Sequence, residues 1–367
     1  YDYIVRSPGV SRYKPELQNA INQGVSISTA NQFWFDAHDA HKDGLIIAVT
    51  GTKGKSTTSS LIAHMLNCLG KQVVKAGNIG KALFDCNADN KIDFWVIELS
   101  SYQLADLEFS PDIAVLLNLY PEHLDWHLGL QNYFKDKLNI FSSVKSHAFI
   151  SNQAKALVDS LLPPGVKTFV PEPFQSKLQK APLPWNLTTE HNRKNVVAAL
   201  NVIAALDLDI DHAIASLETF KSLDHRLQIL HQGNQIIVND AISTIPQSVT
   251  AALESFPGRP IVLIFGGKDR GLDWRELAEV ITHKTSLAIG CFATGEHITK
   301  LVQGRCAHVR YEADFELGIR YALEHAPSDA VVLYSPGAPS APPYQNYEER
   351  GQAFTRIVLE HVKSHSC

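Results

Sequence analysis

Short apolar runs alternate along the chain with longer stretches in which apolar residues recur every three or four positions. Runs of the first type occupy residues 45–50, 72–75, 94–98, 113–117 and 147–151, and each predicts a strand. A stretch of the second type begins near Lys55, and its apolar positions (Leu61, Ile62, Met65, Leu66 and Leu69) predict a helix. Strands that alternate with helices indicate a mostly parallel, doubly wound α/β sheet with right-handed crossovers.

The same alternation starts again beyond a boundary near residues 222–228. Strands are predicted at 235–239, 260–265, 287–293 and 330–334, with helices near 246–255, 272–282 and 313–325. This pattern predicts a second, Rossmann-like α/β domain.

Two further stretches complete the picture. Residues 163–185 contain six prolines and predict irregular or edge structure, and residues 192–206 predict an apolar helix with Val196, Ala199, Leu200 and Ile203 on one face. Residues 1–43 predict a strand, a turn at Ser7-Pro8-Gly9, a helix near 14–23 and a short strand, which is too little for a domain.

We therefore predict three segments. Residues 1–43 are expected to be the remnant of an N-terminal α/β domain, 44–222 a central P-loop domain, and 223–367 the C-terminal domain. The opening Tyr1-Asp2-Tyr3-Ile4-Val5 has the pattern of the middle of a strand, so we expect part of the first domain to lie outside this sequence.

Composition narrows the class of protein. The 367 residues are 45% hydrophobic and 19% charged, as in ordinary globular chains, and no apolar run reaches the roughly 18–20 residues that span a bilayer. No basic-then-apolar secretory leader begins the sequence. A net charge of −5 and a pI near 6.4 argue against a broad nucleic-acid surface. The five cysteines are scattered without a C-x-x-C pair, which favours a reducing cytoplasm, and the 16 histidines form no H-E-x-x-H motif.

A phosphate-binding loop is predicted between the strand at 45–50 and the helix that follows it. The loop Gly51-Thr52-Lys53-Gly54-Lys55-Ser56-Thr57 is shorter than the general pattern G-x-x-x-x-G-K-[ST], because Val49 stands where the first glycine would be. Glycines and a helix N-terminus still let backbone N–H groups approach phosphate oxygens. Lys55 would neutralise the outer phosphates, and the Ser56 hydroxyl could bind Mg²⁺. The competing interpretation is a capped glycine turn with a surface lysine.

Two further side chains follow predicted strands. Glu98 ends the strand at 94–98, and His123 follows the strand at 113–117 within Pro121-Glu122-His123-Leu124-Asp125. Ligands of open α/β sheets bind at the carboxyl ends of the strands, so Glu98 and His123 could serve a metal there. The alternatives are a surface carboxylate and a histidine whose polar atoms are satisfied internally.

At two other positions the residue type alone does not indicate a function. Lys137 lies in the predicted helical stretch Tyr133–Phe141, where composition predicts an exposed lysine. Gly77-Asn78-Ile79-Gly80 predicts a turn with a polar tip, and the simplest interpretation is a β-turn.

Taken together and in order, these motifs resemble the Mur ligases. The resemblance extends over essentially the whole chain and includes the Ser7-Pro8-Gly9-Val10 turn, the loop at 51–57, Gly77–Gly80, Glu98–Leu104, the segments around His123 and Lys137, Glu190–Asn195, Asp224-His225-Arg226, Asn239-Asp240, Gly266–Gly271, Ser335-Pro336-Gly337 and Asn346–Gly351. The first and last of these segments are similar to the glutamate-adding branch.

The resemblance implies an ATP-dependent ligase that adds glutamate to UDP-N-acetylmuramoyl-L-alanine through an acyl phosphate in peptidoglycan synthesis. Lys55, His123 and Lys137 would be catalytic, and Mg²⁺ would lie against Ser56, Glu98, His123 and Lys137, the last of them carbamylated. ATP would contact Gly51, Thr52, Lys53, Gly54, Lys55, Ser56, Thr57, Asn192, Asn195, Arg226 and Asp240. The substrates would contact Ser7, Gly9, Asn78, Thr244, Arg270, Ser340 and Tyr347. We expect a cytoplasmic monomer with small-molecule substrates and neither nucleic-acid nor membrane partners.

The sequence departs from the family pattern at Ile242, where the common glutamate-adding members have a lysine that could pair with the carboxylates of the amino acid. D-Glutamate, the common substrate, and L-glutamate, the substrate of a related branch, therefore both stay open. Because the first domain is incomplete here, we expect weak or no turnover by this stretch of chain. A folylpolyglutamate synthase-like ligase and a non-catalytic nucleotide-binding protein are the competing functions.

Overall fold

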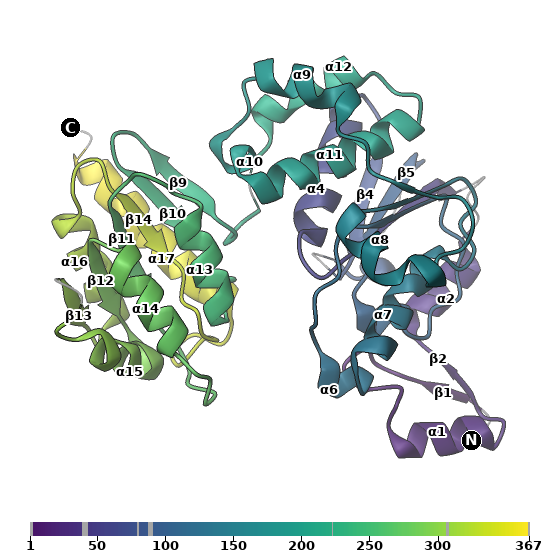
Figure 1. Ribbon diagram of the computed structural model, residues 1–367, viewed down its shortest axis with the longest axis horizontal. Helices are drawn as coiled ribbons and strands as arrows, with labels where there is room; N and C mark the ends of the chain where they lie inside the picture. Colours follow the sequence, from purple (N-terminus) through teal and green to yellow (C-terminus); the bar gives the residue numbers. More distant parts are fainter. Residues whose placement is uncertain are drawn as a thin grey trace. The chain divides into compact units, whose positions relative to one another are not determined.

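The computed structural model describes residues 3–38, 43–78, 81–86, 91–221, 223–305 and 308–365 (Figure 1). Residues Tyr1 and Asp2, Ile79 and Gly80 of the predicted turn, position 222 of the predicted boundary, Cys306 and Cys367 lie outside the described residues. The chain forms two compact units, Tyr1–Phe220 and Lys221–Cys367. In the part of the chain that is described, no helix is both long and apolar enough to span a bilayer.

A six-stranded, fully parallel sheet forms the centre of the first unit. Its strand order is β4 (Val73–Gly77), β5 (Phe94–Glu98), β3 (Leu45–Thr50), β6 (Ile113–Leu116), β7 (His147–Ile150) and β8 (Val166–Thr168). The doubly wound parallel sheet is confirmed. The end of β3, at the middle of the sheet, leads into the predicted phosphate loop.

Both faces of this sheet are covered, which explains why its strands are continuous apolar runs. Ile47 and Val49 of β3 pack with α4 (Lys55–Cys68) and α11 (Glu190–Ala205) on one face. Ile46 and Ala48 pack on the other face, in a core that includes residues of α2 (Ala30–Ala37) and α5 (Ser101–Leu104).

The remaining elements of the first unit are shorter. A two-stranded parallel sheet of β1 (Tyr3–Val5) and β2 (Ser26–Ser28) precedes the main sheet, with α1 (Pro15–Asn22) between its strands. The helices α6 (Leu124–His127), α7 (Leu130–Leu138), α8 (Asn152–Val158) and α12 (Ile210–Ser216) connect or flank the main strands.

The prediction of irregular or edge structure at 163–185 is confirmed for the edge strand β8 and the connections beside it, and it is wrong for residues 172–180, which form helix α9 (Glu172–Lys180). A short helix, α10 (Trp185–Thr188), begins at the end of the stretch. Pro171 and Pro173 occupy the N-cap and the first turn of α9, where the N–H that proline lacks has no intrahelical partner. Phe174 of the same helix is buried in the core. The prolines therefore begin a helix here.

The second unit contains a six-stranded mixed sheet. Its order is β13 (Val309–Tyr311), β12 (Leu287–Gly290), β11 (Ile261–Phe265), β14 (Val331–Tyr334), β10 (Ile236–Asn239) and β9 (Gln228–Gln232), and only the β9–β10 pair among them is antiparallel. The strand predicted at 287–293 ends at Gly290, because α15 (Phe292–Val302) begins two residues later.

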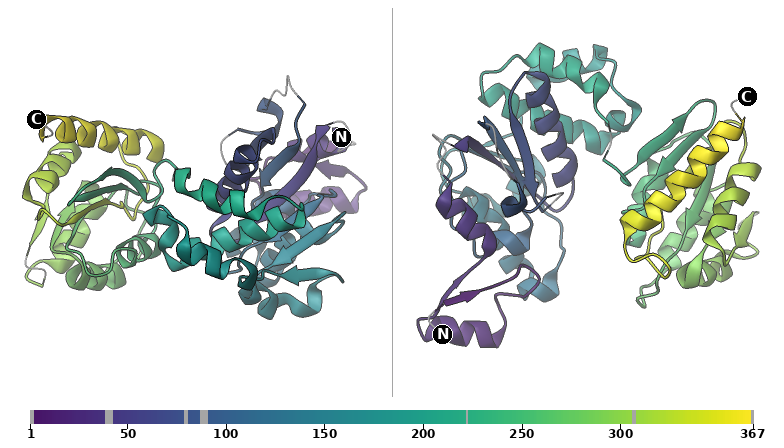
Figure 2. Two further views of the ribbon diagram at one scale, coloured as in Figure 1. Left: turned by 90° about the horizontal axis from the view of Figure 1, so that it is seen from above. Right: turned by 180° about the vertical axis from the view of Figure 1, so that it is seen from behind.

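Helices pack on this second sheet as in a Rossmann-like domain. α16 (Phe315–His325) and the long α17 (Tyr347–His365, yellow in Figure 2) pack against one face, where Ile319, Phe354 and Ile357 join the apolar core. The other helices of the unit are α13 (Pro246–Glu254) and α14 (Arg275–Lys284).

Candidate active site

A tight turn connects the central strand β3 to helix α4. Gly54, the last residue before α4, has φ of +84°, and a Cβ built on it would lie 2.5 Å from Asn195 Oδ1. Both facts favour glycine at this position. Asn195 Nδ2 donates to Asn192 Oδ1 (3.0 Å), so both asparagines of α11 belong to the wall of the loop. The backbone of residues 51–54 thus approaches the N-terminus of a 14-residue helix, the arrangement that binds anions.

Side-chain contacts fix the shape of this loop. Thr52 Oγ1 contacts the Tyr133 hydroxyl (2.7 Å) and accepts from the Tyr120 N–H (2.9 Å). The Lys53 N–H donates to Asn118 Oδ1 (2.8 Å), and Lys53 Nζ lies 2.5 Å from Glu122 Oε1. Residues that follow β6 in the sequence therefore fix the conformation of the loop through its side chains and backbone.

Two lysines converge on the same carbonyl. Lys55 Nζ donates to Gly51 O (3.0 Å) and Thr52 O (3.1 Å), and Lys137 Nζ, from α7, donates to Gly51 O (2.9 Å). Lys137 is only 2% exposed, so the expectation of an exposed helix lysine is wrong. Burial first, and then the nearby charge of Lys55, lower the pKa of Lys137 well below its usual value, although Glu122 and Glu98 act in the opposite direction.

Glu98 is buried beside this pair, not on the surface. It pairs with Val49 of β3 in the sheet and is 1% exposed. Its Oε1 accepts from Asn78 Nδ2 (3.0 Å), whereas its buried Oε2 has no hydrogen-bond partner among the described residues. An unpaired carboxylate oxygen in the interior is costly and indicates a group that a cation would satisfy.

His123 lies at the same edge of the sheet, immediately before α6. Its ring lies 4.9 Å from that of Tyr102, its Nε2 is 3.8 Å from Glu122 Oε2, and its side chain is about half exposed. Burial lowers its pKa, and the charges of Lys137 and Lys55 act in the same direction, against Glu122. Because Glu122 also forms an ion pair with Lys53, its carboxylate places His123 beside the loop.

The described residues contain no group of three or more His, Cys, Asp and Glu side chains that could hold a metal ion. A metal bound here would therefore depend on Lys137 or on the hydroxyl of Ser56, which is the second residue of α4 and is 5% exposed.

Sequence reasoning missed a buried polar chain behind the site. Tyr13 donates to Asp136 (2.9 Å), Asp136 Oδ2 contacts His127 Nδ1 (2.6 Å), and His127 Nε2 contacts Ser101 Oγ (2.9 Å). Asp136 precedes Lys137 on α7, and Ser101 begins α5 three residues after Glu98, so this hydrogen-bond network ties α7 to α5. Only its position next to Lys137 in the sequence could have indicated Asp136.

In the second unit, Asp240 follows β10 and points inward. Its Oδ2 accepts from Ser243 Oγ (2.5 Å) and Ser335 Oγ (2.8 Å), and its Oδ1 accepts from the Leu227 N–H (3.1 Å). Burial raises its pKa to about 6, although these hydrogen bonds and Arg226 act in the opposite direction. In this structure the Asp240 carboxyl organises its own turn, and its contact with ribose stays a prediction. Arg226 Nε, in contrast, is buried without a hydrogen-bond partner in the described part of the chain.

The residues predicted to bind glutamate lie on loops that follow three strands of the second sheet and at the start of α17. Thr244 follows β10, Arg270 follows β11, Ser340 follows β14 and Tyr347 begins α17. Arg350 of α17 is fully buried and donates to the carbonyl groups of Gly266 (3.3 Å), Ala338 (3.0 Å) and Pro339 (3.2 Å), which joins two of these loops.

The side chains of these residues differ in their surroundings. Ser340 Oγ is buried and lacks a hydrogen-bond partner within the described ranges. Burial raises the pKa of Tyr347 to about 12, and the charge of Arg226 acts in the opposite direction. The ring of His225, which precedes Arg226, lies 6.2 Å from that of Tyr347. The Arg270 side chain is exposed.

Comparison with known proteins identifies the family to which the chain is related. Residues 49–170 match the Mur ligase middle domain, and residues 225–337 match the Mur ligase, glutamate ligase domain. A UDP-N-acetylmuramoyl-L-alanine--L-glutamate ligase of Xanthomonas oryzae is 37% identical over 98% of this chain and 82% of its own length. A protein with the same name from Xylella fastidiosa is 38% identical with the same coverage.

Solved structures share the fold at low sequence identity. The UDP-N-acetylmuramate-alanine ligase MurC of Thermotoga maritima has a TM-score of 0.66 at 17% identity and is covered over 86% of its length by 99% of this chain. MurF ligase of the same organism, solved in complex with ADP, has a TM-score of 0.64 at 15% identity, with 100% of this chain and 96% of that one covered. With both domain matches and relatives at 37–38% identity over nearly the whole chain, the protein belongs to the Mur ligase family.

Proposed function

We propose that this ligase joins L-glutamate to UDP-N-acetylmuramoyl-L-alanine and converts ATP to ADP and phosphate. The observation that carries the proposal is the grouping of Lys55, Lys137, Glu98 and His123 around the Gly51–Gly54 turn. In this proposal residues 1–43 contribute to the sugar-nucleotide site, 44–222 bind ATP, and 223–367 bind the amino acid.

The loop of the first unit would bind the ATP phosphates through backbone N–H groups and Lys55. Asn195, which adjoins Gly54, and Asn192, which is bonded to Asn195, would contact the adenine side. The contacts of Arg226 and Asp240 with ATP stay predictions. Mg²⁺, when bound, would neutralise the negative charge that develops on the transferred phosphoryl group. Its protein ligands would be Glu98, whose Oε2 lacks a partner among the described residues, with Ser56, His123 and Lys137.

The low pKa of Lys137 supports its carbamylation. A lysine amine reacts with CO2 only in its neutral form, and burial beside Lys55 favours that form at neutral pH. The neutral amine nitrogen would form a bond to the CO2 carbon and release one proton, which converts the amine into an anionic carbamate. The product would attract the charge of Lys55 and supply the carboxylate that the set of Glu98 and His123 lacks.

The reaction proposed here has two steps. The substrate carboxylate attacks the γ-phosphate of ATP, which gives an acyl phosphate and ADP. The amine of glutamate, held near Thr244, Arg270, Ser340 and Tyr347, then attacks the acyl carbon and expels phosphate. Orientation of the three substrates can account for several kcal/mol of the barrier reduction.

The choice of L-glutamate rests on two observations. The curated relatives described above are both named L-glutamate ligases. Ile242, between Asp240 and Ser243, cannot pair with a carboxylate of the amino acid, so the glutamate pocket must differ from one that uses a lysine there.

Phosphate release tests the proposal directly. Full-length enzyme with ATP, Mg²⁺ and UDP-N-acetylmuramoyl-L-alanine is expected to release phosphate with L-glutamate and at least tenfold more slowly with D-glutamate. The reverse preference would reassign the enantiomer. A pteroyl substrate in place of the sugar nucleotide serves as the control for the folylpolyglutamate alternative, and turnover with it alone would refute the proposed substrate.

A further inference from the structure

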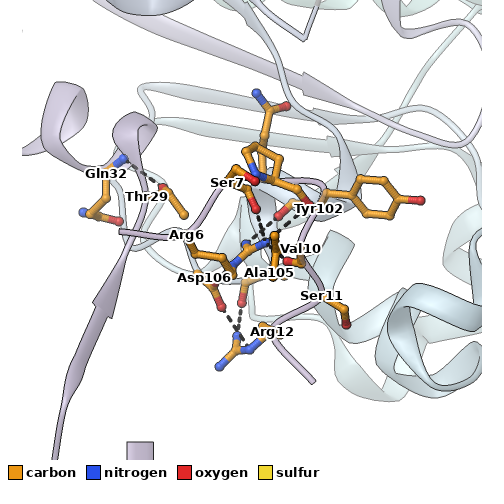
Figure 3. A network of polar contacts seen from close by, with 12 residues as sticks. Arg6, Ser7, Val10, Ser11, Arg12, Thr29, Gln32, Tyr102, Ala105 and Asp106 are labelled. Carbon is orange, nitrogen blue, oxygen red and sulfur yellow. Dashed lines mark hydrogen bonds and ion pairs between the residues drawn. The ribbon is translucent and has the colours of Figure 1, made fainter. Parts of the chain in front are cut away.

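A buried arginine lies at the base of an exposed turn near the beginning of the chain (Figure 3). The Arg6 side chain is 1% exposed, whereas Ser7, Pro8, Gly9 and Val10 are all exposed. A Cβ built on Gly9 would have no heavy atom within 4 Å, so the outer side of the turn is open. The turn is therefore exposed to solvent, and the buried Arg6 guanidinium lies beneath it.

The guanidinium of Arg6 gathers the carbonyl groups of this turn. Its Nη1 donates to Val10 O (2.5 Å), Ser7 O (3.1 Å) and Pro8 O (3.3 Å). The Val10 N–H donates to Ser7 O (3.1 Å), which closes the turn. The Arg6 guanidinium thus binds three carbonyl groups of the turn, and the conformation of residues 7–10 depends on these hydrogen bonds.

The same guanidinium attaches the turn to the segment that follows Glu98. Its Nε forms an ion pair with Asp106 Oδ2 (2.5 Å), and its Nη2 donates to Tyr102 O (3.0 Å). The ring of Tyr102 lies 4.9 Å from that of His123. Arg6 therefore connects the exposed turn, through Tyr102, to His123.

A second arginine completes the attachment. Arg12 Nε lies 2.9 Å from Asp106 Oδ1, and Arg12 Nη1 donates to Ala105 O. Each oxygen of Asp106 thus binds one arginine, one on each side of the turn. The Asp106 side chain is 8% exposed and Arg12 is 32% exposed, so the Arg6–Asp106 half of the network is the buried one.

Stability alone does not explain this arrangement. A buried ion pair is often no more stabilising than apolar residues of similar volume, whereas its directional hydrogen bonds can specify one conformation. Lysine would preserve the charge, but only the guanidinium offers five donors in a fixed plane.

We propose that Arg6, with Asp106, is a positioning residue that sets the Ser7–Val10 turn against the site so that the turn binds the sugar-nucleotide substrate. This inference rests on the proposed function, because it assigns the turn to that substrate. Arg6 acts through the turn and does not itself contact the reacting atoms.

Arg6→Lys tests the proposal in the full-length enzyme. The KM for UDP-N-acetylmuramoyl-L-alanine is expected to rise about tenfold or more, while the KM values for ATP and glutamate and the kcat stay within about twofold. Asp106→Asn, which preserves shape but removes the charge, is expected to show the same selective change. Lys145→Ala, which removes an exposed ion pair with Asp112 in the same unit, is the matched control and should leave all three KM values unchanged.

Three results would overturn the role of Arg6. If the melting temperature falls in both variants but no KM changes, Arg6 is a stability residue only. If all three KM values rise together, the effect is not specific to the turn. Calorimetric binding of the sugar nucleotide to the unsubstituted enzyme separates the role of Arg6 from the proposed function. If the unsubstituted enzyme does not bind the sugar nucleotide, the proposed substrate is refuted. If it binds normally and the Arg6→Lys variant is unaffected, only the role of Arg6 is refuted.

Discussion

The two units treat the carboxyl edges of their sheets differently. In the first unit, two lysines share the Gly51 carbonyl and Glu98 Oε2 has no partner among the described residues, so the polar groups are not fully satisfied. In the second unit, Asp240 accepts three hydrogen bonds, so its buried carboxyl is satisfied within the protein. Arg350 donates to three carbonyls through its Nη1 and Nη2 groups, and only its Nε lacks a partner among the described residues. Only Arg226 Nε and Ser340 Oγ break that pattern among the predicted site residues of the second unit that are described.

This difference separates two uses of buried polar groups. Groups that are satisfied internally fix the shape of loops, whereas groups that lack a partner need a ligand to offset their desolvation. Substitutions at the edge of the first sheet are therefore expected to lower the activity. Substitutions at the edge of the second sheet are expected mainly to lower the stability and the affinity for the amino acid.

The largest effect is expected for Lys137→Ala. Because the variant removes the buried amine at Gly51 O and the proposed carbamate with it, kcat should fall by about 10³-fold or more. Phosphate release under saturating substrates measures this. Lys135→Ala, two residues earlier on the exposed side of α7, is the control and should retain activity. An active Lys137→Ala enzyme would contradict the assignment of the first edge as the chemical centre.

The next effect concerns Asp240 and the stability of the second unit. Its carboxyl has a pKa of about 6 in the folded protein against an ordinary value of 3.8, so between these values the folded state binds more protons than the unfolded state. The contribution of Asp240 to the free energy of unfolding should therefore be fully present below about pH 4 and be lost, by roughly 3 kcal/mol, as the pH rises through 6. Hydrogen exchange of β10 and β14, corrected for intrinsic rates, measures the change.

Asp240→Asn supplies the control for that pH dependence. The amide does not titrate, so this component of the pH dependence should disappear, whatever the variant's absolute stability. A pH dependence that persists in the variant would show that another group causes it.

Substitution of Glu98 by glutamine is expected to have a smaller effect. The amide oxygen can still accept from Asn78, but the charge that would bind the metal is lost. The Mg²⁺ concentration for half-maximal phosphate release should rise about 10–100-fold. Glu108→Gln, at an exposed position of the same unit, should leave the Mg²⁺ dependence unchanged. An unchanged requirement in Glu98→Gln would remove Glu98 from the metal site.

The features that the sequence predicted are local ones. The strand at 45–50, the loop and the helix from Lys55 follow from periodicity and glycine positions within about 25 residues. Burial of Lys137 was not predictable from its helix, since Lys135 in the same helix is exposed and only packing against the Gly51 loop distinguishes the two. The Tyr13–Asp136–His127–Ser101 chain spans 123 residues between its first two members, and no local pattern encodes such a contact.

The smallest effect is expected for alanine at Gly54, and comparison with alanine at Gly165 separates backbone strain from steric crowding at the phosphate loop. Gly54 and Gly165 have nearly the same φ, +84° and +88°, but a Cβ on Gly54 would lie 2.5 Å from Asn195 Oδ1, whereas one on Gly165 meets nothing within 4 Å. Alanine at either position should cost about 1–2 kcal/mol of stability through the left-handed backbone. Only Gly54→Ala should also weaken ATP binding, by about tenfold, because Asn195 must move away from the loop. Calorimetric titration of ATP into both variants measures this, and equal ATP affinities would mean that the contact between Gly54 and Asn195 does not shape the nucleotide site.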